Sequence, residues 1–347
     1  METVLEDVLF EIRGRAGGVT LNRPKALNAL TRDMLVAFYK QVKAWDADPA
    51  VERIVIRGAG DRAFCAGGDV VSLYHAGKAG QDAFTRFFWD EYRADYLTST
   101  LSKPYVALLD GIVMGGGVGL SVHGPYRVAT EKTLFAMPET GIGLIPDVGG
   151  THLLGHMPGK LGVYLGLLGE RLKAADCLYA GIATHYVPSE KIPALAEALE
   201  TKSGPVDEIL SRFHDDPGAA PLAERQAEID RYFAGDTVED IVAALGEGDA
   251  WAIGIRDRLL GLSPTSLKLT LRAVLAGAAL DLAECLRQEY RIVCHIRHGD
   301  DFYEGVRAQL VDKDRSPKWK PASLEDVAQD AIDRHFTAPE GGDLQFG

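Results

Sequence analysis

The chain lacks several features that would indicate a secreted or membrane protein. Of its 347 residues only 4 are cysteines (Cys65, Cys177, Cys285 and Cys294), and no two of them form a CxxC pair. The best apolar stretch, residues 112–122, contains four glycines and is too short to cross a bilayer. The first residues, METVLEDVLFEI, are acidic where a signal or transit peptide would carry Arg and Lys. These absences predict reduced thiols and a cytoplasmic location.

Positive charge is also in short supply. The chain has 37 Lys and Arg against 50 Asp and Glu, a net charge of −13. A general binder of nucleic acid or of an anionic membrane needs a basic face, so we expect neither as a partner. A few local cations would still suffice for an anionic small molecule.

Short apolar runs alternate with longer helical patterns over the first two thirds of the chain. The patterns predict paired strands at residues 8–12 and 19–22, joined by a turn at Ala16-Gly17-Gly18. They then predict a helix over 31–45, a strand at 54–56, a helix over 83–97, and strands at 105–109, 126–130 and 133–136. After Val187 the pattern is almost entirely helical, with strong amphipathic helices over 267–280 and 282–296. We therefore expect an α/β fold, with a core over residues 1–200 and a helical region over 201–347 that packs on the core or on a partner subunit.

Two glycine-rich loops each follow a predicted strand. One is Phe64-Cys65-Ala66-Gly67-Gly68-Asp69, and the other, Gly115-Gly116-Gly117, also opens a helix. Glycine lets backbone N–H groups approach a ligand closely, and one N–H from each loop can form an oxyanion hole for a carbonyl. The alternative is that each loop is only a tight turn. A dinucleotide site is not favoured, because Leu120 stands where the third Gly of G-x-G-x-x-G would be.

Two carboxylates lie in the apolar stretch Met137–Gly150, which is rich in Pro and Gly. Apolar surroundings raise a carboxyl pKa, so Glu139 and Asp147 are candidates for a base, an acid or a nucleophile. The alternative makes Glu139 a surface loop residue and Asp147 the N-cap of the helix after Val148.

Three motifs together resemble the crotonase (enoyl-CoA hydratase/isomerase) superfamily. They are LNRPKALNAL at 21–30, the Ala66–Asp69 loop and the run Gly115–Gly117. Residues 116–124, 137–150, 263–268, 301–307 and 312–321 further resemble its 3-hydroxyisobutyryl-CoA hydrolase branch, so that nearly the whole chain is covered. The resemblance implies a spiral of β-β-α turns closed by C-terminal helices, with a coenzyme A thioester as the ligand.

The resemblance also implies roles for particular residues. The N–H groups of Gly68 and Gly116 would hold the thioester oxygen, while Glu139 and Asp147 would carry out the reaction. Glu91 matches a position that contacts the short hydroxyacyl group. Further expected substrate-binding residues are Ala26, Ala66, Asp69 and Gly115, with Arg23 and Lys25 as candidates for the phosphates of coenzyme A. No metal and no cofactor is implied, since coenzyme A is part of the substrate.

One departure from the superfamily pattern separates the possible reactions. A hydratase uses two glutamates, and the position of the second is Gly119 here, which argues against water addition. The expected reaction is hydrolysis of 3-hydroxyisobutyryl-CoA to 3-hydroxyisobutyrate and coenzyme A, a step of valine catabolism. Whether 3-hydroxypropionyl-CoA is an equal substrate stays open, as does the choice between nucleophilic attack by Glu139 and activation of water.

Two other functions remain as alternatives. One is an enoyl-CoA isomerase or hydratase of the same superfamily, and the other is a non-catalytic acyl-CoA-binding relative. The latter predicts a lost carboxylate, whereas Glu91, Glu139 and Asp147 are all present. A homo-oligomer is possible, because the superfamily often forms trimers.

Overall fold

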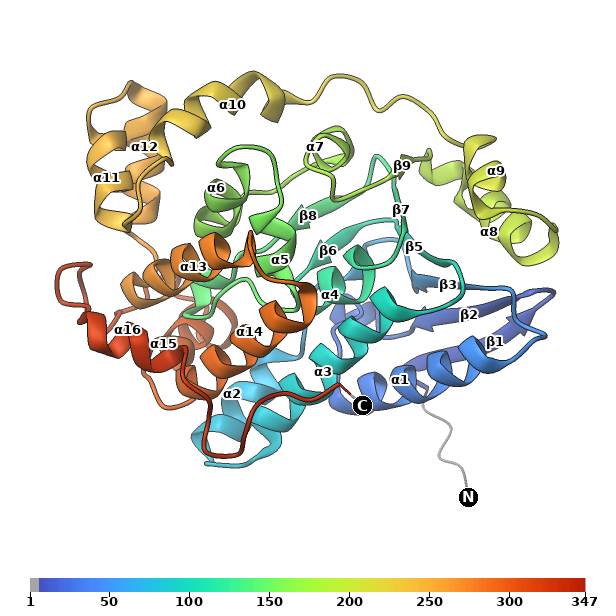
Figure 1. Cartoon of the computed structure of the whole chain (residues 1–347), viewed down its shortest axis with the longest axis horizontal. Coiled ribbons are helices and arrows are strands. Elements are labelled where there is room, and N and C mark those ends of the chain that lie inside the picture. Colours follow the sequence, from blue (N-terminus) through green and yellow to red (C-terminus); the bar gives the residue numbers. More distant parts are fainter. Residues whose placement is uncertain (1–5, 347) are drawn as a thin grey trace. The chain divides into compact units, whose positions relative to one another are not determined.

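The computed structural model describes residues 6–346 (Figure 1). The chain divides into two compact units. The first unit contains the chain up to Gly68, Arg93–Phe135 and Arg171–Ala223. The second contains Asp69–Tyr92, Ala136–Glu170 and the chain from Glu224 onward. Each unit is thus built from three separate segments of the chain. The expected division into residues 1–200 and 201–347 has one boundary only, and it stays a prediction.

The strands form two sheets. The larger has the order β1 (Val8–Arg13), β2 (Ala16–Leu21), β3 (Arg53–Gly58), β5 (Tyr105–Leu109), β7 (Tyr126–Ala129) and β9 (His185–Tyr186). Its β1 and β2 are antiparallel, and the other neighbours are parallel. The smaller has the order β4 (Ala63–Cys65), β6 (Ile112–Met114) and β8 (Leu134–Ala136). From β3 to β8, successive strands enter the two sheets alternately, which confirms the predicted spiral.

The predicted turn at Ala16-Gly17-Gly18 is wrong, because these residues begin strand β2. The hairpin instead turns at Gly14 and Arg15, where Gly14 has φ +56°. Gly17 is glycine for a different reason: a Cβ there would lie 2.5 Å from the ring of Trp45. That ring belongs to α1 (Arg32–Ala47), whose N-cap Thr31 accepts a hydrogen bond from Met34 N. The glycine therefore allows close packing of a helix on the sheet.

The core of the first unit lies between the larger sheet and two later helices. Side chains of β3, β5 and β7 pack against α8 (Ile192–Thr201) and α9 (Val206–Ser211). The remaining elements of this unit are η1 (Pro24–Ala26), α4 (Gly116–Val122), α7 (Ala174–Tyr179) and η3 (Ser189–Lys191). The predicted strands and the helical character after Val187 are confirmed here.

The second unit is mainly helical. It contains α2 (Val70–Lys78), η2 (Glu139–Ile142), α5 (Gly150–Gly155), α6 (Leu161–Leu168), α11 (Val238–Gly246), α12 (Ala250–Leu259), α13 (Pro264–Gly277), α14 (Leu282–Ile296), α15 (Asp301–Val306), the π-helical turn η4 (Arg307–Val311) and α16 (Gln329–His335). Two helices pass between the units along the chain, α3 (Ala83–Thr100) and α10 (Pro221–Tyr232). The amphipathic pattern over 282–296 coincides with α14.

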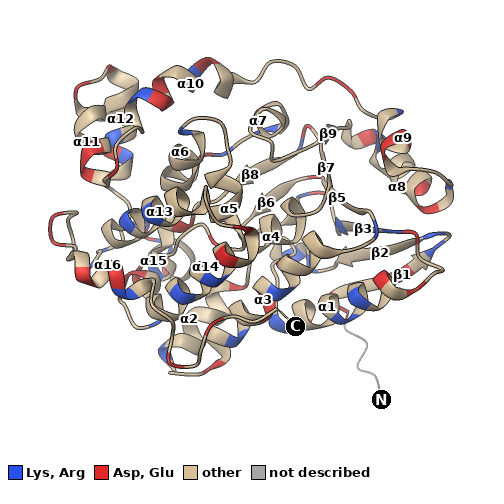
Figure 2. Cartoon of the chain, in the orientation of Figure 1, with Lys and Arg blue, Asp and Glu red and all other residues tan. Residues whose placement is uncertain are grey.

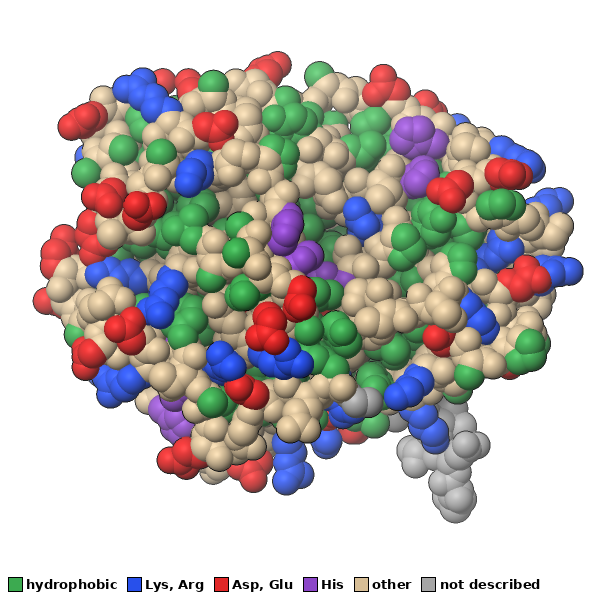
Figure 3. Space-filling view, viewed as in Figure 1, with side chains coloured by type: hydrophobic (Ala, Val, Ile, Leu, Met, Phe, Trp, Pro, Cys, Tyr) green, Lys and Arg blue, Asp and Glu red, His purple; other side chains and the backbone are tan. Residues whose placement is uncertain are grey.

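Charges of both signs occur on the same elements. Figure 2 shows Lys, Arg, Asp and Glu along α14, where Arg287 pairs with Glu284 and Arg291 with Asp343. On the face shown in Figure 3, acidic, basic and apolar side chains are interspersed. Among residues 6–346, no helix is both long enough and apolar enough to span a membrane.

Candidate active site

The two glycine loops lie side by side in the first unit. Strands β4 and β6 pair in parallel, with Cys65 opposite Val113, so the chain leaves both strands at the same edge of the sheet. Gly67 has φ +113° and Gly115 has φ +47°, conformations that L side chains rarely adopt. A Cβ on Gly67 would lie 3.8 Å from the nitrogen of Gly116. The loops are thus close enough for each to offer a backbone N–H to one oxygen atom, as an oxyanion hole requires.

The motif LNRPKALNAL supports the first glycine loop. Leu30 N donates to the carbonyl of Gly67 at 2.8 Å, and Ala66 N donates to the carbonyl of Leu27 at 3.0 Å. The fully buried Asn28 donates to the carbonyl of Ala63 at 2.8 Å. Asn28 thereby ties this motif to the start of β4, a role that sequence reasoning did not assign to it.

The other expected binding residues occupy different positions. In the first unit, Lys25 and Ala26 are exposed on η1, while the partly buried Arg23 donates to the carbonyl of Ala29 at 2.6 Å. In the second unit, Asp69 caps α2 by accepting a hydrogen bond from Ser72 N at 3.2 Å. The expected substrate-binding roles of Arg23, Lys25, Ala26, Ala66, Asp69 and Gly115 stay predictions.

Three buried carboxyl groups gather in the second unit. Glu91 on α3, Glu139 on η2 and Asp147 after it are 2%, 5% and 3% exposed. The alternative position of Glu139 in a surface loop is therefore wrong. Asp147 is also not a helix cap, because the N-cap of α5 is Gly149, which has no side chain to cap with. Instead, Asp147 Oδ2 accepts a hydrogen bond from the hydroxyl of Tyr92 at 2.6 Å.

Burial and mutual repulsion make these groups hard to ionise. Burial raises the pKa of Glu91 well above its ordinary value, and the charges of Asp147 and Glu139 raise it further. The pKa of Glu139 is likewise raised, by burial and then by Asp147. Burial raises the pKa of Asp147 to about 7, although the Tyr92 hydrogen bond opposes the shift. A proton on this cluster is therefore available near neutral pH.

Two oxygen atoms of the carboxyl cluster accept no hydrogen bond from the described residues. Among the described residues, Glu91 Oε1 and Glu139 Oε2 are buried and have no hydrogen-bond partner. A buried polar atom without a partner is costly and marks a site that a ligand or a reacting group can use. A hydrogen-bond donor that entered the cluster would therefore find two acceptors there.

The turn that carries Glu139 is held by the C-terminal part of the chain. Ser263 N donates to the carbonyl of Thr140 at 3.3 Å. A Cβ on Gly143 would lie 2.2 Å from the backbone of Asp301, and one on Gly305 would lie 2.4 Å from the backbone of Ile142. Helix α15 thus packs directly on the backbone of η2, which explains the glycines at both positions.

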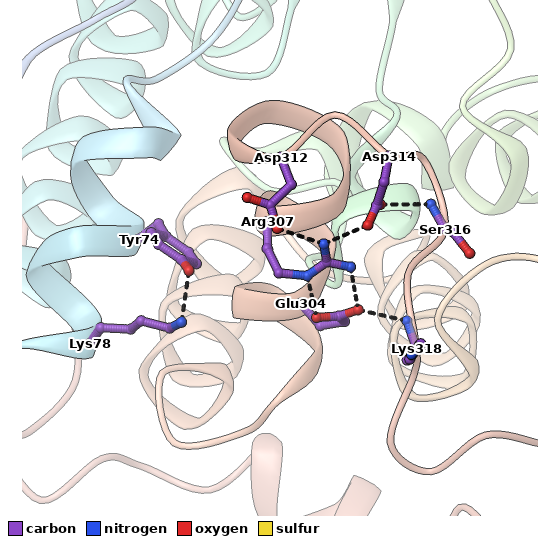
Figure 4. A network of polar contacts seen from close by, with 8 residues as sticks. All are labelled: Tyr74, Lys78, Glu304, Arg307, Asp312, Asp314, Ser316 and Lys318. Atoms are coloured by element: carbon purple, nitrogen blue, oxygen red, sulfur yellow. Dashed lines mark hydrogen bonds and ion pairs between the residues drawn. The ribbon is translucent and has the colours of Figure 1, made fainter.

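An arginine then fixes the chain that follows α15 (Figure 4). Arg307 donates to Glu304 twice at 2.8 Å, to Asp312 at 2.8 Å and to Asp314 at 2.7 Å. The bonds from Arg307 to Glu304, and then the one from Lys318 N, lower the pKa of Glu304 to about 2. The segment 312–320 returns to α15 through Lys320 N, which donates to Asp301 at 2.8 Å. Hydrogen bonds therefore connect α15, which packs on the Glu139 turn, to the segment 312–320 that follows it.

Gly119 has no room for a side chain. It lies on α4 in the first unit, and a Cβ there would meet the carboxylate of Asp95 at 2.5 Å. Asp95 is fully buried on α3. A second glutamate at position 119 is thus incompatible with this packing as well as absent from the sequence.

Comparison with known proteins identifies close relatives. The family model described as Enoyl-CoA hydratase/isomerase matches residues 16–336. A protein of Danio rerio named 3-hydroxyisobutyryl-CoA hydrolase, mitochondrial, is 49% identical over 98% of this chain and 92% of its own length. The Homo sapiens protein of the same name is 48% identical over 98% of this chain and 91% of its own.

Two solved structures are also similar to this chain. A structure described as a carnitinyl-CoA dehydratase from Mycobacterium thermoresistibile has a TM-score of 0.94 at 44% identity, covering 98% of this chain and 99% of that one. One described as an enoyl-CoA hydratase from Rhodobacter sphaeroides has a TM-score of 0.91 at 40% identity, covering 98% and 100%.

The comparison corrects the expected location. The curated relatives are named as mitochondrial proteins, which contradicts the cytoplasmic location predicted above. The four cysteines are free and buried, as expected for reduced thiols. Reduced thiols separate a reducing compartment from an oxidising one, but they do not distinguish between two reducing compartments.

Proposed function

Because the chain belongs to the enoyl-CoA hydratase/isomerase family, we propose that it is a thioesterase that hydrolyses 3-hydroxyisobutyryl-CoA to 3-hydroxyisobutyrate and coenzyme A, a step of valine catabolism. Curated relatives nearly half identical over 98% of the chain carry the name of this activity. The structural observation behind the proposal is the buried pair Glu139 and Asp147, combined with a glycine at position 119. This set supplies carboxylates for hydrolysis while leaving out the second glutamate of a hydratase.

The glycine loops would polarise the thioester. In the proposed reaction, the N–H groups of Gly68 and Gly116 bind the thioester oxygen and stabilise the negative charge that develops on it. Removing one such donor typically costs about 3 to 4 kcal/mol of transition-state stabilisation. These donors belong to the backbone. The role of glycine at both positions is therefore to let the thioester oxygen approach the N–H groups, because glycine has no side chain in the way.

Two mechanisms of hydrolysis are open to Glu139. In the first, its carboxylate attacks the carbonyl carbon, the C–S bond breaks, and coenzyme A leaves as a thiolate; water then cleaves the acyl anhydride and restores the carboxylate. In the second, Glu139 takes a proton from water as the water attacks the same carbon. Both routes consume one water and release one acid and one thiol.

Asp147 and Glu91 would orient the reacting groups. In the proposed complex, Asp147 is held by Tyr92 and accepts a hydrogen bond from the substrate hydroxyl or the attacking water. The buried Glu91 contacts the hydroxyl end of the acyl group through an oxygen that has no partner among the described residues. A site with buried acceptors rejects an acyl group that lacks a hydroxyl, because the acceptors would then stay unpaired.

The first test follows free thiol release from 3-hydroxyisobutyryl-CoA. We expect rapid release, with crotonyl-CoA untouched as judged by its conjugated absorbance. 3-Hydroxypropionyl-CoA should also react, because the loss of one methyl contact changes discrimination by only about 1 to 3 kcal/mol. Loss of crotonyl-CoA absorbance without thiol release would overturn the proposal.

That contrary result would favour a second candidate function, an enoyl-CoA hydratase or isomerase. The descriptions of the two similar solved structures favour it, since they name a dehydratase and a hydratase. The packing of Asp95 against Gly119 opposes it. The same assay therefore separates the two candidates in a single experiment.

The pH dependence of the reaction follows from the raised pKa of Asp147, about 7. Below that pH the cluster holds an additional proton, so one of the carboxylates that the reaction needs is neutral. Above that pH the proton is lost and the carboxylate forms. We therefore expect kcat/KM to rise with pH, with an inflection near 7 that belongs to the cluster of Glu91, Glu139 and Asp147 as a whole. Thiol release measured from pH 5.5 to 9 checks this expectation. A rate that falls over this range would contradict it.

A further inference from the structure

We propose that Glu289 is a positioning residue for Asp147, acting through the turn that follows Asp147 in the chain. The inference rests on the proposed thioesterase function and adds a residue to it. Glu289 lies on α14, 140 residues after Gly149 in sequence, and is fully buried. Neither its position in a helical pattern nor any motif singled it out.

The carboxylate of Glu289 binds the turn at three points. Gly149 N donates to Glu289 Oε2 at 2.7 Å. Thr151 donates to Oε1 twice, from its backbone N at 2.9 Å and from its hydroxyl at 2.5 Å. Both oxygens are thus used, and all three donors come from the start of α5. The carboxylate replaces the side-chain cap that Gly149 cannot provide.

The turn held in this way is strained. Val148 has φ +55°, a conformation that a β-branched residue rarely adopts, and Gly149 has φ +77°. Such a backbone persists only where surrounding contacts determine it, and it occurs often at functional sites. Because Val148 directly follows Asp147, the dihedral angles fixed by Glu289 set the direction of the Asp147 side chain.

Helix α14 supports Asp147 through a second contact. Tyr290, the residue after Glu289, packs edge-on against Tyr92 with ring centroids 6.5 Å apart. Tyr92 in turn donates its hydroxyl to Asp147 Oδ2 at 2.6 Å. Two successive residues of one helix therefore hold Asp147, one through its backbone and the other through its hydrogen-bond donor.

A carboxylate at this place is costly unless it has a role. Burial raises the pKa of Glu289 to about 8, and the charge of Asp147 adds to the shift, whereas the bonds from Thr151 and Gly149 oppose it. Tyr92 and Cys285 also face Glu289, and its charge raises the pKa of each. An apolar side chain would avoid these penalties but would leave the strained turn unsupported.

The decisive variant is Glu289→Gln, compared with Glu284→Gln on the exposed part of the same helix. The amide has the size of the carboxyl, but its NH₂ group cannot accept a hydrogen bond. Either Gly149 or Thr151 then loses its acceptor, and the turn loses part of its support. We expect kcat for thiol release to fall about 10- to 100-fold, as for a small displacement of a reacting group. KM should change by less than about 2-fold, because ground-state binding is not altered. Glu284→Gln should match the wild type.

A second pair of variants covers the case in which Glu289→Gln does not fold, as judged by its thermal unfolding. Thr151→Val removes one donor to Glu289 and should lower kcat, whereas Thr151→Ser keeps the hydroxyl and should restore it. Wild-type kcat in Glu289→Gln, a raised KM with unchanged kcat, or equal kcat in the two Thr151 variants would overturn the inference. A wild-type protein that releases no thiol would instead overturn the proposed function.

Discussion

Glu139→Gln is expected to lower kcat for thiol release by about 10³-fold or more, because general base and nucleophilic roles each contribute factors of this order. The amide has the shape of the acid but can neither attack the carbonyl carbon nor take a proton from water. Glu139 is 5% exposed, so the replacement leaves the surface unchanged. KM should stay close to the wild-type value if the lost interaction is specific to the transition state.

Thermal unfolding provides the control for this variant. A carboxyl whose folded pKa is raised above its unfolded value destabilises the fold as pH rises through that range. Removing the ionisable group at Glu139 should therefore leave the protein at least as stable as the wild type at pH 8. Glu228→Gln, at an exposed ion pair with Arg225, should change neither quantity. Substantial thiol release by Glu139→Gln would show that another group attacks or activates water.

Gly143→Ala is expected to be the most damaging small substitution in the turn that carries Glu139. Its Cβ would lie 2.2 Å from the backbone of Asp301, and the residue has φ +72°. The clash with backbone and the unfavourable φ together should cost on the order of 3 to 4 kcal/mol of folding free energy. Urea unfolding measures this loss, and activity should fall with it because η2 must move away from α15.

The same turn offers a matched control. At Gly141 a Cβ would meet only a methyl group of Leu262 at 3.8 Å, an ordinary contact, and φ is not in the left-handed region. Gly141→Ala should therefore unfold at nearly the same urea concentration as the wild type. Equal stability of the two alanine variants would show that α15 does not constrain this turn.

Much of the fold follows from local patterns. The first long helix begins after Thr31 and buries Met34, Leu35, Phe38, Val42 and Trp45, as their helical spacing predicts. The hairpin turn was misplaced because glycine has two uses. At Gly14 it permits a positive φ, whereas at Gly17 it makes room for Trp45. Only the partner in such a contact, here Trp45, 28 residues later in the chain, distinguishes the two uses.

The arrangement of the candidate site could be predicted where motif residues lie close together in the chain. The glycine loops and the Glu139 stretch belong to continuous motifs, and the structure places each as a unit. Tyr92, Asn28 and Glu289 were missed because their partners are distant in sequence. Tyr92 and Asp147 are 55 residues apart, and Glu289 and Gly149 are 140 apart. No local spacing rule relates such positions, so only the folded chain shows them.

The contact between Gly143 and α15 has a consequence for the order of events during protein synthesis. Asp301, Phe302 and Gly305 are the residues against which the turn of Glu139 packs. When residue 143 leaves the ribosome, this surface has not yet been made, and more than 150 further residues must be translated first. The nascent chain therefore carries an unfinished turn while nearly half of the 347 residues are made, and the turn can be completed only after Gly305 has been translated.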